Sequence, residues 1–340
     1  MIAEKIENPR SKTRLPEGGQ VESIKMRLSE DDKKWLSTRF EGGIKFDEPM
    51  RKHTSLRVGG PAEVFAIPET LEELMVLVEW AWKKEIPYLT VGGGTNLLIT
   101  DNGVNGFILL LTRCLNKITR SGKDNGREWV TAAAGVKLAT FCRYAIEKGL
   151  SDTSFALGIP GTIGGAIMMN AGTALGSMAD ILETVAVYQP ERGMQKFKKT
   201  HLNFGYRSLS LERVCNPSHG LPIVLEGCFR LHRGDPDTLQ QEAHGILLER
   251  REREPNRFPS AGSFFKNPES GKTAGELIDL AGLKGRKIGD AEISSKHANY
   301  IVNCKNATAA DILSLMKLIQ ETVFKRFGIS LEPEVRIIGD

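Results

Sequence analysis

Residues 156–172 read ALGIPGTIGGAIMMNAG, and this stretch decides the fold. Its five glycines stand among small and apolar residues, at positions 158, 161, 164, 165 and 172. Because glycine has no Cβ, this density indicates that the backbone passes close to a flat apolar group or to another backbone segment. Asn170 is the main polar side chain of the stretch.

Two more glycine-rich segments precede this stretch. HTSLRVGGPA spans 53–62, and VGGGTN spans 91–96 directly after a predicted strand, YLTV, at 88–91. Backbone N–H groups that point into a glycine-lined concavity suit phosphate oxygens. The spacing is not GxGxxG, and it is not the GxxxxGK of a P-loop, so a Rossmann site or an ATP P-loop is unsupported. One glycine run fits a flexible turn equally well, but three of them favour a bound dinucleotide with a flat ring such as an isoalloxazine.

Short strand patterns alternate with helical patterns through the first two thirds of the chain. Thr70 with Glu73 predicts a capping box, and the helix that follows carries its apolar residues on one face. Further strands are predicted at 62–68, 106–111, 129–134, 183–189 and 223–231, with a helix from about 137 to 148. This mixture predicts an α+β fold.

The pattern changes after residue 232. A long charged helix at 237–253 ends before Pro255, and a helix at 275–283, a strand at 299–304, an amphipathic helix at 308–327 and a final strand at 334–339 follow. We therefore predict a loosely held or disordered extension over 1–27, a first domain over 28–234 and a smaller α+β domain over 235–340.

Composition restricts the class of protein. The 340 residues include 46 Lys and Arg against 42 Asp and Glu, a formal net charge of +4 that is too weak to predict nucleic-acid binding. Five widely spaced cysteines and six histidines show no disulfide framework and no metal-ligand spacing. With no signal peptide pattern and no long apolar run, we expect a cytoplasmic protein that does not bind membranes. Monomer is the default expectation, because no heptads are present.

Three further motifs carry polar side chains suited to chemistry. SAGSFFKNP (260–268) contains Ser263, whose hydroxyl could donate a proton, although this motif alone favours an ordinary turn serine. FGYRSLS (204–210) places Arg207 beside Tyr206, and its guanidinium could hold a carboxylate in a bidentate fork or simply face solvent. LEPEVRIIG (331–339) contains Glu334, which by itself reads as an exposed strand carboxylate. No GxSxG elbow surrounds Ser263, so a hydrolytic nucleophile is unsupported.

Taken together and in this order, the six motifs resemble the UDP-N-acetylenolpyruvoylglucosamine reductase family, flavoenzymes of peptidoglycan precursor synthesis. The resemblance covers about residues 30–339, with GSFFKNP and EPEVR its most specific parts. It implies a vanillyl-alcohol-oxidase (PCMH) type FAD-binding domain of two α+β subdomains over 28–234. A substrate-binding domain would follow over 235–340, with the last strand returning to the flavin.

The resemblance also implies roles for single residues. Ser263 matches the family's proton donor, and Arg207 and Glu334 match its residues that stabilise the negative charge of the enediolate. The positions implied for the substrate are Tyr206 and Asn267, and Lys266 lies between Ser263 and Asn267 on the same loop. Independently of the resemblance, Arg253 is a candidate for a phosphate contact because it lies close to Ser263 in the sequence, although it otherwise reads as part of a solvated helix face. Those implied for FAD are His53, Thr54, Arg57, Gly92, Gly93, Gly94, Thr95, Asn96, Gly161, Thr162, Gly164, Gly165, Asn170, Ala171 and Gly172.

The implied reaction uses NADPH as co-substrate and non-covalently bound FAD, without a metal. A hydride is added to the vinyl methylene carbon of the enolpyruvyl ether of UDP-N-acetylglucosamine, and Ser263 protonates the neighbouring carbon. Losing one electrostatic stabiliser of such a transition state typically costs ~10²–10³ in rate.

This sequence departs from the family pattern in two places. Ser208 and Ser210 flank Leu209 where the family often reads Y-R-x-S, and the chain resembles the class without an extra tyrosine-bearing loop over the substrate. What covers the bound substrate is therefore left open.

Two other functions remain as alternatives. A flavin oxidase of the same superfold, acting on a sugar or an alcohol, would tether its flavin through a side chain such as His53. A scaffold that binds nucleotides without catalysis would tolerate the loss of Ser263, Arg207 and Glu334.

Overall fold

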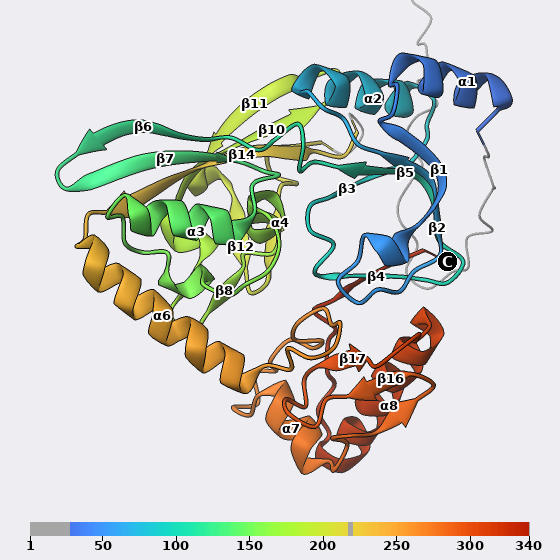
Figure 1. Cartoon of the computed structure of the whole chain (residues 1–340), viewed down its shortest axis with the longest axis vertical. Helices are drawn as coiled ribbons and strands as arrows, with labels where there is room; N and C mark the ends of the chain where they lie inside the picture. The colour runs from blue at the N-terminus through green and yellow to red at the C-terminus, as the bar shows by residue number, and fades with distance from the viewer. Residues whose placement is uncertain (1–27, 217–219, 340) are drawn as a thin grey trace, which may run out of the picture.

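The computed structural model describes residues 28–216 and 220–339, which form an upper body with two sheets and a smaller lower body (Figure 1). The extension predicted over 1–27 lies outside the described residues. None of the described helices is long and apolar enough to span a membrane.

The first sheet of the upper body is mixed, with the strand order β1-β2-β5-β3. β1 (Ile44–Pro49) runs antiparallel to β2 (Pro61–Ala66), whereas β5 (Val104–Leu110) lies parallel to both β2 and β3 (Tyr88–Val91). Both faces of β2 are buried, because Val64 belongs to the largest core cluster and Phe65 to a smaller one on the other side. This burial explains why residues 64–67 are all apolar.

Two helices lie beside each other at the top of this sheet, α1 (Glu30–Arg39) and α2 (Leu71–Lys83) (Figure 1). The stacked rings of Trp35 and Trp80, with centroids 5.1 Å apart, join them. Thr70 caps α2 by accepting a hydrogen bond from the Glu73 N–H. The Glu73 carboxylate accepts from the N–H of Glu69 rather than that of Thr70, so the reciprocal bond of the predicted capping box is displaced by one residue.

The second sheet is five-stranded and antiparallel, with the order β11-β10-β14-β7-β6. Its strands are β6 (Ile118–Asp124), β7 (Arg127–Ala133), β10 (Leu182–Gln189), β11 (Gly193–Lys198) and β14 (Ile223–His232). Helices α3 (Leu138–Glu147) and α4 (Ile163–Met168) lie along one face (Figure 1), and the short α5 (Met178–Ile181) contacts β14. A Cβ at Gly164 would lie 2.8 Å from the Ala134 Cβ, so this glycine is what lets α4 lie flat on the sheet.

Short elements complete the upper body. Two small hairpins form separate two-stranded sheets, one of β8 (Gly172–Thr173) with β9 (Gly176–Ser177) and the other of β12 (Asn203–Gly205) with β13 (Ser208–Ser210). Single turns of 3-10 helix occur at η1 (Met50–Lys52), η2 (Ser154–Ala156) and η3 (Lys199–His201).

The lower body packs two helices against a three-stranded sheet. Its elements are α7 (Ala274–Leu280), β15 (Lys287–Ile288), β16 (Ala291–Ile293), β17 (Ile301–Asn303) and α8 (Ala309–Phe327). Helix α6 (Pro236–Arg253) connects it to the upper body, and Ala243 of α6 belongs to the core of the upper body. The domain boundary at 234/235 stays a prediction.

The chain returns from the lower body to the upper body at its end. β18 (Arg336–Ile338) pairs in parallel with β4 (Leu97–Ile99). Leu56, Val58 and Leu98 of the upper body are part of the lower body's apolar core. Two hydrogen-bonded contacts reinforce this interface: Asn303 Nδ2 donates to the Leu56 carbonyl at 3.0 Å, and the Asp101 carboxylate accepts from the first two N–H groups of α8.

The strands and helices predicted between residues 62 and 339 are confirmed, with ends displaced by a few residues. Local patterns did not predict the remaining helices and strands, namely α1, β1, β4, β6, α4, β8, β9, α5, β11, β12, β13, β15 and β16. Most of these elements are short or polar, and tertiary pairing rather than local pattern stabilises them. β6 is an example, because six of its seven residues are exposed.

We expect Asp101→Ala to destabilise the protein by about 1–2 kcal/mol, because it leaves two N–H groups at the start of α8 without their acceptor. Both bonds are 2.9 Å long and cross between the two bodies. Urea unfolding followed by circular dichroism measures the change. Asp124→Ala, at an exposed hairpin end, is the control, and equal unfolding midpoints for the two variants would contradict the expectation.

Candidate active site

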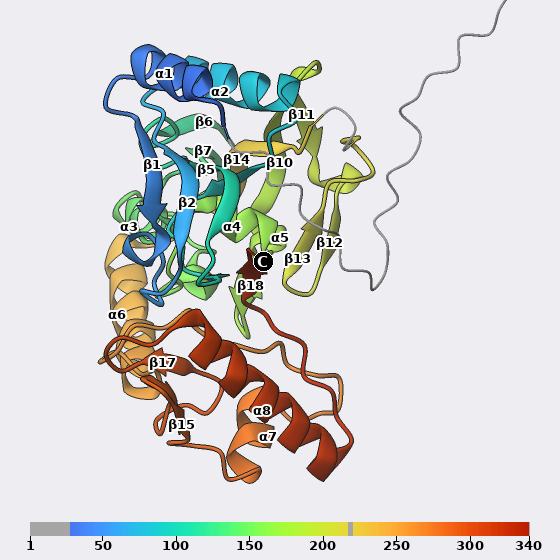
Figure 2. The same cartoon turned by 90° about the vertical axis from the view of Figure 1, so that its right-hand side faces the viewer.

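Four segments that are far apart in the sequence meet where the two bodies join. They are the glycine loop after β3, the β12–β13 hairpin, the loop at 260–268 and the residues just before β18. Figure 2 shows β18 and the β12–β13 hairpin close together at the centre of the molecule. The hydrogen bonds and ion pair described below connect all four segments.

The backbone of Glu334 is fixed from both bodies. Its N–H donates to the Phe264 carbonyl at 2.8 Å, and its carbonyl accepts from Asn96 Nδ2 at 3.0 Å. The carbonyl of Asn96 then accepts from the Arg336 N–H, where β18 begins. Asn96, at the end of the glycine loop, therefore places Glu334 against the loop that contains Ser263.

The Glu334 side chain is largely buried, with 18% of it exposed. Burial raises the pKa of this carboxyl group, and the nearby Arg207 and Lys266 charges offset the rise only in part. A carboxyl group with a raised pKa takes up a proton more easily and can then donate a hydrogen bond. This is the carboxyl group that the sequence alone suggested would be an exposed strand residue.

Arg207 lies at the tip of the β12–β13 hairpin, between the paired residues Gly205 and Ser208. Its Nη1 donates to the Gly172 carbonyl at 2.7 Å, and its Nε lies 3.1 Å from Oε1 of Glu334. The Nε–H makes no well-directed hydrogen bond, so the contact with Glu334 is an ion pair. The φ angle of +55° is costly for a non-glycine residue and is typical of residues held in place for function.

Asn170 supports this hairpin tip, and Tyr206 lies on it. Asn170 Nδ2 donates to the Gly205 carbonyl at 2.9 Å, while its Oδ1 accepts from the Ala179 N–H. Asn170 therefore ties the hairpin to the end of α4 instead of presenting its amide freely. Tyr206 is 54% exposed, and the Arg207 guanidinium lies 5.3 Å from the centre of its ring.

The loop at 260–268 runs beside the residues before β18. Phe264 and Phe265 are buried in the lower body's core, and Phe265 forms an isolated bridge with Pro333. Ser263 precedes them and is partly buried, with no hydrogen-bond partner for its hydroxyl among the described residues. Lys266 N donates to the Glu332 carbonyl, and its ammonium pairs with the Glu332 carboxylate.

The glycine segments contact one another directly. A Cβ at Gly92 would lie 2.0 Å from Thr162 Oγ1, and one at Gly94 would lie 2.0 Å from the His53 carbonyl. Within the described residues, the N–H groups of Gly92, Gly93 and Gly94 donate to no other backbone group. Such free N–H groups in a glycine-lined loop can bind the phosphates of a dinucleotide.

The other residues predicted at the cofactor differ in their surroundings. His53 stacks on Phe65 with its Nε2 2.9 Å from Glu48, and Thr54 donates to the Val58 carbonyl. Arg57 and Gly165 are exposed. Gly172 packs against the Gly176 carbonyl, so this glycine and Gly164 are explained by protein packing alone, and Ala171 packs against the main core.

Two predicted substrate residues have structural partners. Asn267 Oδ1 accepts from the Ala274 N–H at the start of α7, at 3.0 Å. Arg253 pairs with Glu249 on α6, and 74% of its side chain is exposed. The structure therefore brings Ser263, Lys266, Arg207, Glu334 and Asn96 together, but not Arg253.

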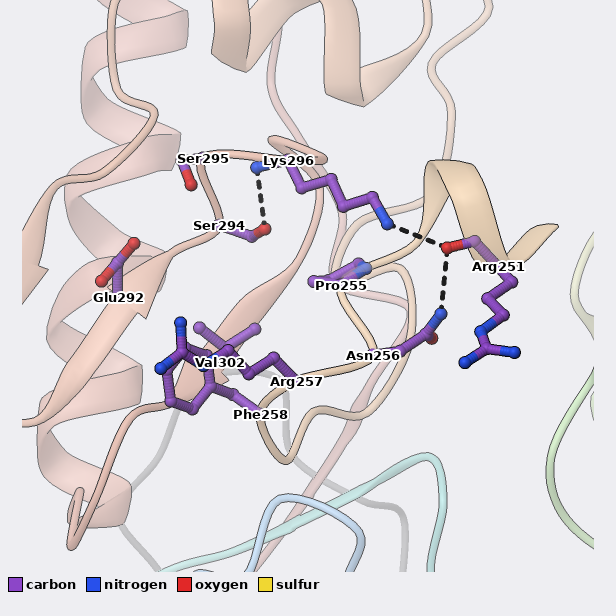
Figure 3. Close-up of a pocket in the computed structure, with 10 residues that line it drawn as sticks. All are labelled: Arg251, Pro255, Asn256, Arg257, Phe258, Glu292, Ser294, Ser295, Lys296 and Val302. Carbon is purple, nitrogen blue, oxygen red and sulfur yellow. Dashed lines mark hydrogen bonds between the residues drawn. The ribbon is translucent and has the colours of Figure 1, made fainter. Parts of the chain in front are cut away.

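A cavity of about 390 Å³ lies beside this region, within the lower body and the end of α6 (Figure 3). Three cationic residues line it, Arg251, Arg257 and Lys296, but their charges do not converge. Arg251 points away, and the Lys296 ammonium donates to the Arg251 carbonyl at 2.9 Å (Figure 3). None of the residues predicted for catalysis lines the cavity, and no described group of His, Cys, Asp or Glu is arranged to hold a metal.

Sequence reasoning missed two buried residues next to the loop at 260–268, Asn299 and Tyr300, and it took the half-buried Arg250 of α6 for part of a solvated helix face. Asn299 bonds to Phe264 and Phe265, and burial raises the pKa of Tyr300, as does its bond to Glu254. Arg250 pairs with Glu254 at 2.5 Å and packs over Gly158. Nothing in the local pattern singles out these side chains, because Asn299 and Tyr300 read as part of a strand and Arg250 as part of a charged helix.

Known proteins resemble this chain along most of its length. Residues 254–338 match the family UDP-N-acetylenolpyruvoylglucosamine reductase, C-terminal domain, and residues 62–195 match an FAD binding domain. The reductase of that name from Desulfosudis oleivorans is 41% identical over 307 residues, 90% of this chain and 98% of the relative. The one from Desulforamulus reducens is 40% identical over 305 residues, 90% of this chain and 97% of the relative.

A solved structure agrees with these relatives. The crystal structure of UDP-N-acetylenolpyruvylglucosamine reductase from Thermus caldophilus superposes with a TM-score of 0.70 and 34% sequence identity. It covers 87% of this chain and 99% of that one.

We expect Glu334→Gln to stabilise the protein increasingly as the pH rises through and above 4.5, the ordinary pKa of this group. Below that pH the carboxyl group is neutral in both the folded and the unfolded protein. Above it, the unfolded chain ionises readily while burial opposes ionisation in the folded chain, so the wild type loses stability relative to the variant.

Unfolding free energies measured between about pH 4 and pH 8 check this pH dependence. Glu332→Gln is the matched control, because Glu332 is exposed and pairs with Lys266. A gain for Glu334→Gln that does not change with pH would contradict the expectation.

Proposed function

The chain belongs to the UDP-N-acetylenolpyruvoylglucosamine reductase family, and from this premise we propose how its site performs the reaction. The protein is an FAD-dependent oxidoreductase that reduces UDP-N-acetylglucosamine enolpyruvate to UDP-N-acetylmuramate in peptidoglycan synthesis, with NADPH as reductant. The observation that carries the site assignment is the pairing of Arg207 with Glu334 beside the loop of Ser263.

The glycine segments suit FAD because they offer backbone N–H groups as hydrogen-bond donors. Free N–H groups of Gly92, Gly93 and Gly94 would bind the pyrophosphate, and Thr95, Asn96, Gly161 and Thr162 lie against the same loop. Gly165 is exposed on α4, between buried neighbours, and there a flat ring could approach the backbone. His53, Thr54, Arg57, Asn170 and Ala171 would shape the edges of the site, whereas Gly164 and Gly172 would support it by packing. Bound FAD supplies the hydride that the substrate accepts.

Arg207 and Glu334 would bind the pyruvyl carboxylate. Addition of hydride to the vinyl methylene carbon moves negative charge onto this carboxylate, and a guanidinium beside it stabilises that charge. A second carboxylate would oppose it by like-charge repulsion, but Glu334 has a raised pKa and can hold a proton. In its neutral form Glu334 donates a hydrogen bond to the carboxylate.

Ser263 would complete the reaction. Its hydroxyl gives a proton to the carbon next to the methylene, so that one hydride and one proton add across the double bond. An enediolate is a strong base, so a hydroxyl of ordinary acidity serves as its acid. The serine oxygen then recovers a proton from water. No hydrogen bond within the described residues occupies this hydroxyl, in keeping with a donor that acts only on bound substrate.

The remaining polar residues would bind the UDP-sugar. Lys266 and Asn267 follow Ser263 on the same loop, and Tyr206 is exposed beside Arg207. Arg253 would have to leave Glu249 to take part, so we assign it to the outer edge of the substrate site.

The oxidase alternative finds no support in the surroundings of His53. A flavin tether would need a ring nitrogen of His53, but this ring stacks on Phe65 and its Nε2 contacts Glu48, so only Nδ1 is left for such a bond. Release of intact FAD when the protein is denatured would exclude such a tether.

We also propose that the enzyme works in the cytoplasm as a monomer. All five cysteines are free, which suits a reducing compartment. Cell fractionation tests the location, and analytical ultracentrifugation of the purified protein tests the oligomeric state.

The decisive test of the function is anaerobic visible absorption of the purified protein. The flavin band should bleach when NADPH is added, and it should return when UDP-N-acetylglucosamine enolpyruvate is added without oxygen. UDP-N-acetylglucosamine is the control ligand, because it lacks the double bond and cannot accept a hydride. A band that returns only with oxygen would favour an oxidase, and a protein without flavin would contradict both functions.

Ser263→Ala should leave bleaching by NADPH unchanged and slow the return of the band by ~10²–10⁴, the usual contribution of a positioned acid. Stopped-flow absorption measures both steps separately. Ser260→Ala is the matched control, since Ser260 lies on the same loop and pairs with Val302 through its backbone. Equal rates in the two variants would remove Ser263 from the mechanism.

A further inference from the structure

We propose that Asn299 is a positioning residue for proton transfer, because its amide clamps the loop of Ser263 at a fixed place beside Glu334. This inference rests on the proposed function, in which Ser263 is the proton donor. Asn299 itself is 4% exposed and would touch neither substrate nor cofactor.

Asn299 binds the loop through three hydrogen bonds. Its Oδ1 accepts from the Phe265 N–H at 2.9 Å, and its Nδ2 donates to the Phe265 carbonyl at 2.8 Å. Its own carbonyl accepts from the Phe264 N–H at 2.7 Å. A primary amide offers one donor and one acceptor side by side, which matches both polar groups of a single residue in the loop.

The clamped loop in turn holds the residues before β18. The Phe264 carbonyl accepts from the Glu334 N–H at 2.8 Å, and Lys266 N donates to the Glu332 carbonyl at 2.9 Å. Phe264 and Phe265 therefore lie between Asn299 on one side and the strand of Glu334 on the other. The clamp fixes the relative position of the proton donor and the carboxyl group that binds the substrate.

Ser263 needs such a clamp because its other neighbour, Gly262, has no side chain that could fix the backbone by packing. Gly262 has a φ angle of +77°, and a Cβ there would meet nothing within 4 Å. Ser260 and Ala261 are anchored in the lower body, but a glycine in open space adds backbone freedom between them and Ser263. The Phe264 side therefore holds the serine most directly.

Asn299 is itself anchored to α6. The turn that contains it is closed by the Ser294 hydroxyl, which accepts from the N–H groups of Lys296 and His297. The Lys296 ammonium donates to the Arg251 carbonyl at the end of α6 (Figure 3). The ring of the next residue, Tyr300, packs edge-on against His297 with centroids 4.9 Å apart. Asn299 therefore connects the turn closed by Ser294 to the loop that contains Gly262 and Ser263.

The consequence concerns one half of the reaction only. Bleaching by NADPH does not use Ser263, whereas transfer to the enolpyruvyl substrate requires the serine within reach of one carbon. A misplacement of about 1 Å can cost 10²-fold in rate. Loss of the clamp should therefore slow the second half-reaction and leave the first unchanged.

The test compares Asn299→Ala, Asn299→Asp and the wild type by anaerobic stopped-flow absorption. Ser294→Ala is the control, because it loosens the same turn but leaves the amide clamp intact. We expect Asn299→Ala to keep the wild-type rate of bleaching by NADPH and to lose about 10²-fold in the return of the flavin band with the enolpyruvyl substrate. The solvent deuterium isotope effect on that return should rise, since proton transfer becomes the slow step.

Asn299→Asp adds a pH dependence that a loss of stability alone would not produce. An ionised carboxylate can accept from the Phe265 N–H but cannot donate to the Phe265 carbonyl. A protonated carboxyl group can do both, so the rate relative to the wild type should recover as the pH falls, and it should not recover in Asn299→Ala. This variant also decides the question if Asn299→Ala fails to fold.

The possible failures are distinguishable. If the flavin of the wild type is not reoxidised by the enolpyruvyl substrate, the proposed function and this inference both fall. If the wild type reacts and the Asn299 variants keep its rate, its isotope effect and its pH profile, only the inference falls. Equal slowing of both half-reactions would also overturn it, because that result reports general loosening.

Discussion

The parallel pairing of β18 with β4 is the constraint on which the site depends. It brings the end of the chain back to the upper body, so that the Glu334 carbonyl accepts from Asn96, 238 positions earlier in the sequence. Without this pairing, Arg207 on the upper body and Ser263 on the lower body would share no common neighbour. The apolar contacts of Leu56, Val58 and Leu98 with the lower body's core make the arrangement rigid.

The arrangement held by the β18–β4 pairing includes two unfavourable local features at the site. Glu334 is buried far enough that its pKa rises, and Arg207 has a φ angle that is unfavourable for a side chain with a Cβ. Each cost is tolerated because many contacts elsewhere hold the segment in place, as is common at functional sites. In return, a carboxyl group that can stay protonated lies against a fixed guanidinium, in an environment that excludes most water. Electrostatic stabilisation is strongest in such surroundings.

The glycine segments show which features of the site the sequence predicts and which it does not. Their density correctly indicated close backbone approaches, but a sequence does not reveal what approaches each glycine. Gly164 and Gly172 meet other parts of the protein, whereas Gly93 and Gly165 are exposed. The same limit applies to charged residues: Arg207 and Arg253 look alike in the sequence, yet one pairs with Glu334 inside the site and the other lies on the surface of α6.

The sequence by itself determined the α+β class, most strands and helices, and a set of motifs specific enough to indicate the family. These properties depend on local periodicity, capping residues and residue order, which are present before the chain folds. Only the tertiary structure decided that Arg207 meets Glu334, that Asn267 accepts from the first N–H of α7 and that Asn299 clamps the loop of Ser263. The first contact depends on how two separately packed cores meet, and the other two depend on how distant segments pack within the lower body. No local pattern encodes either geometry.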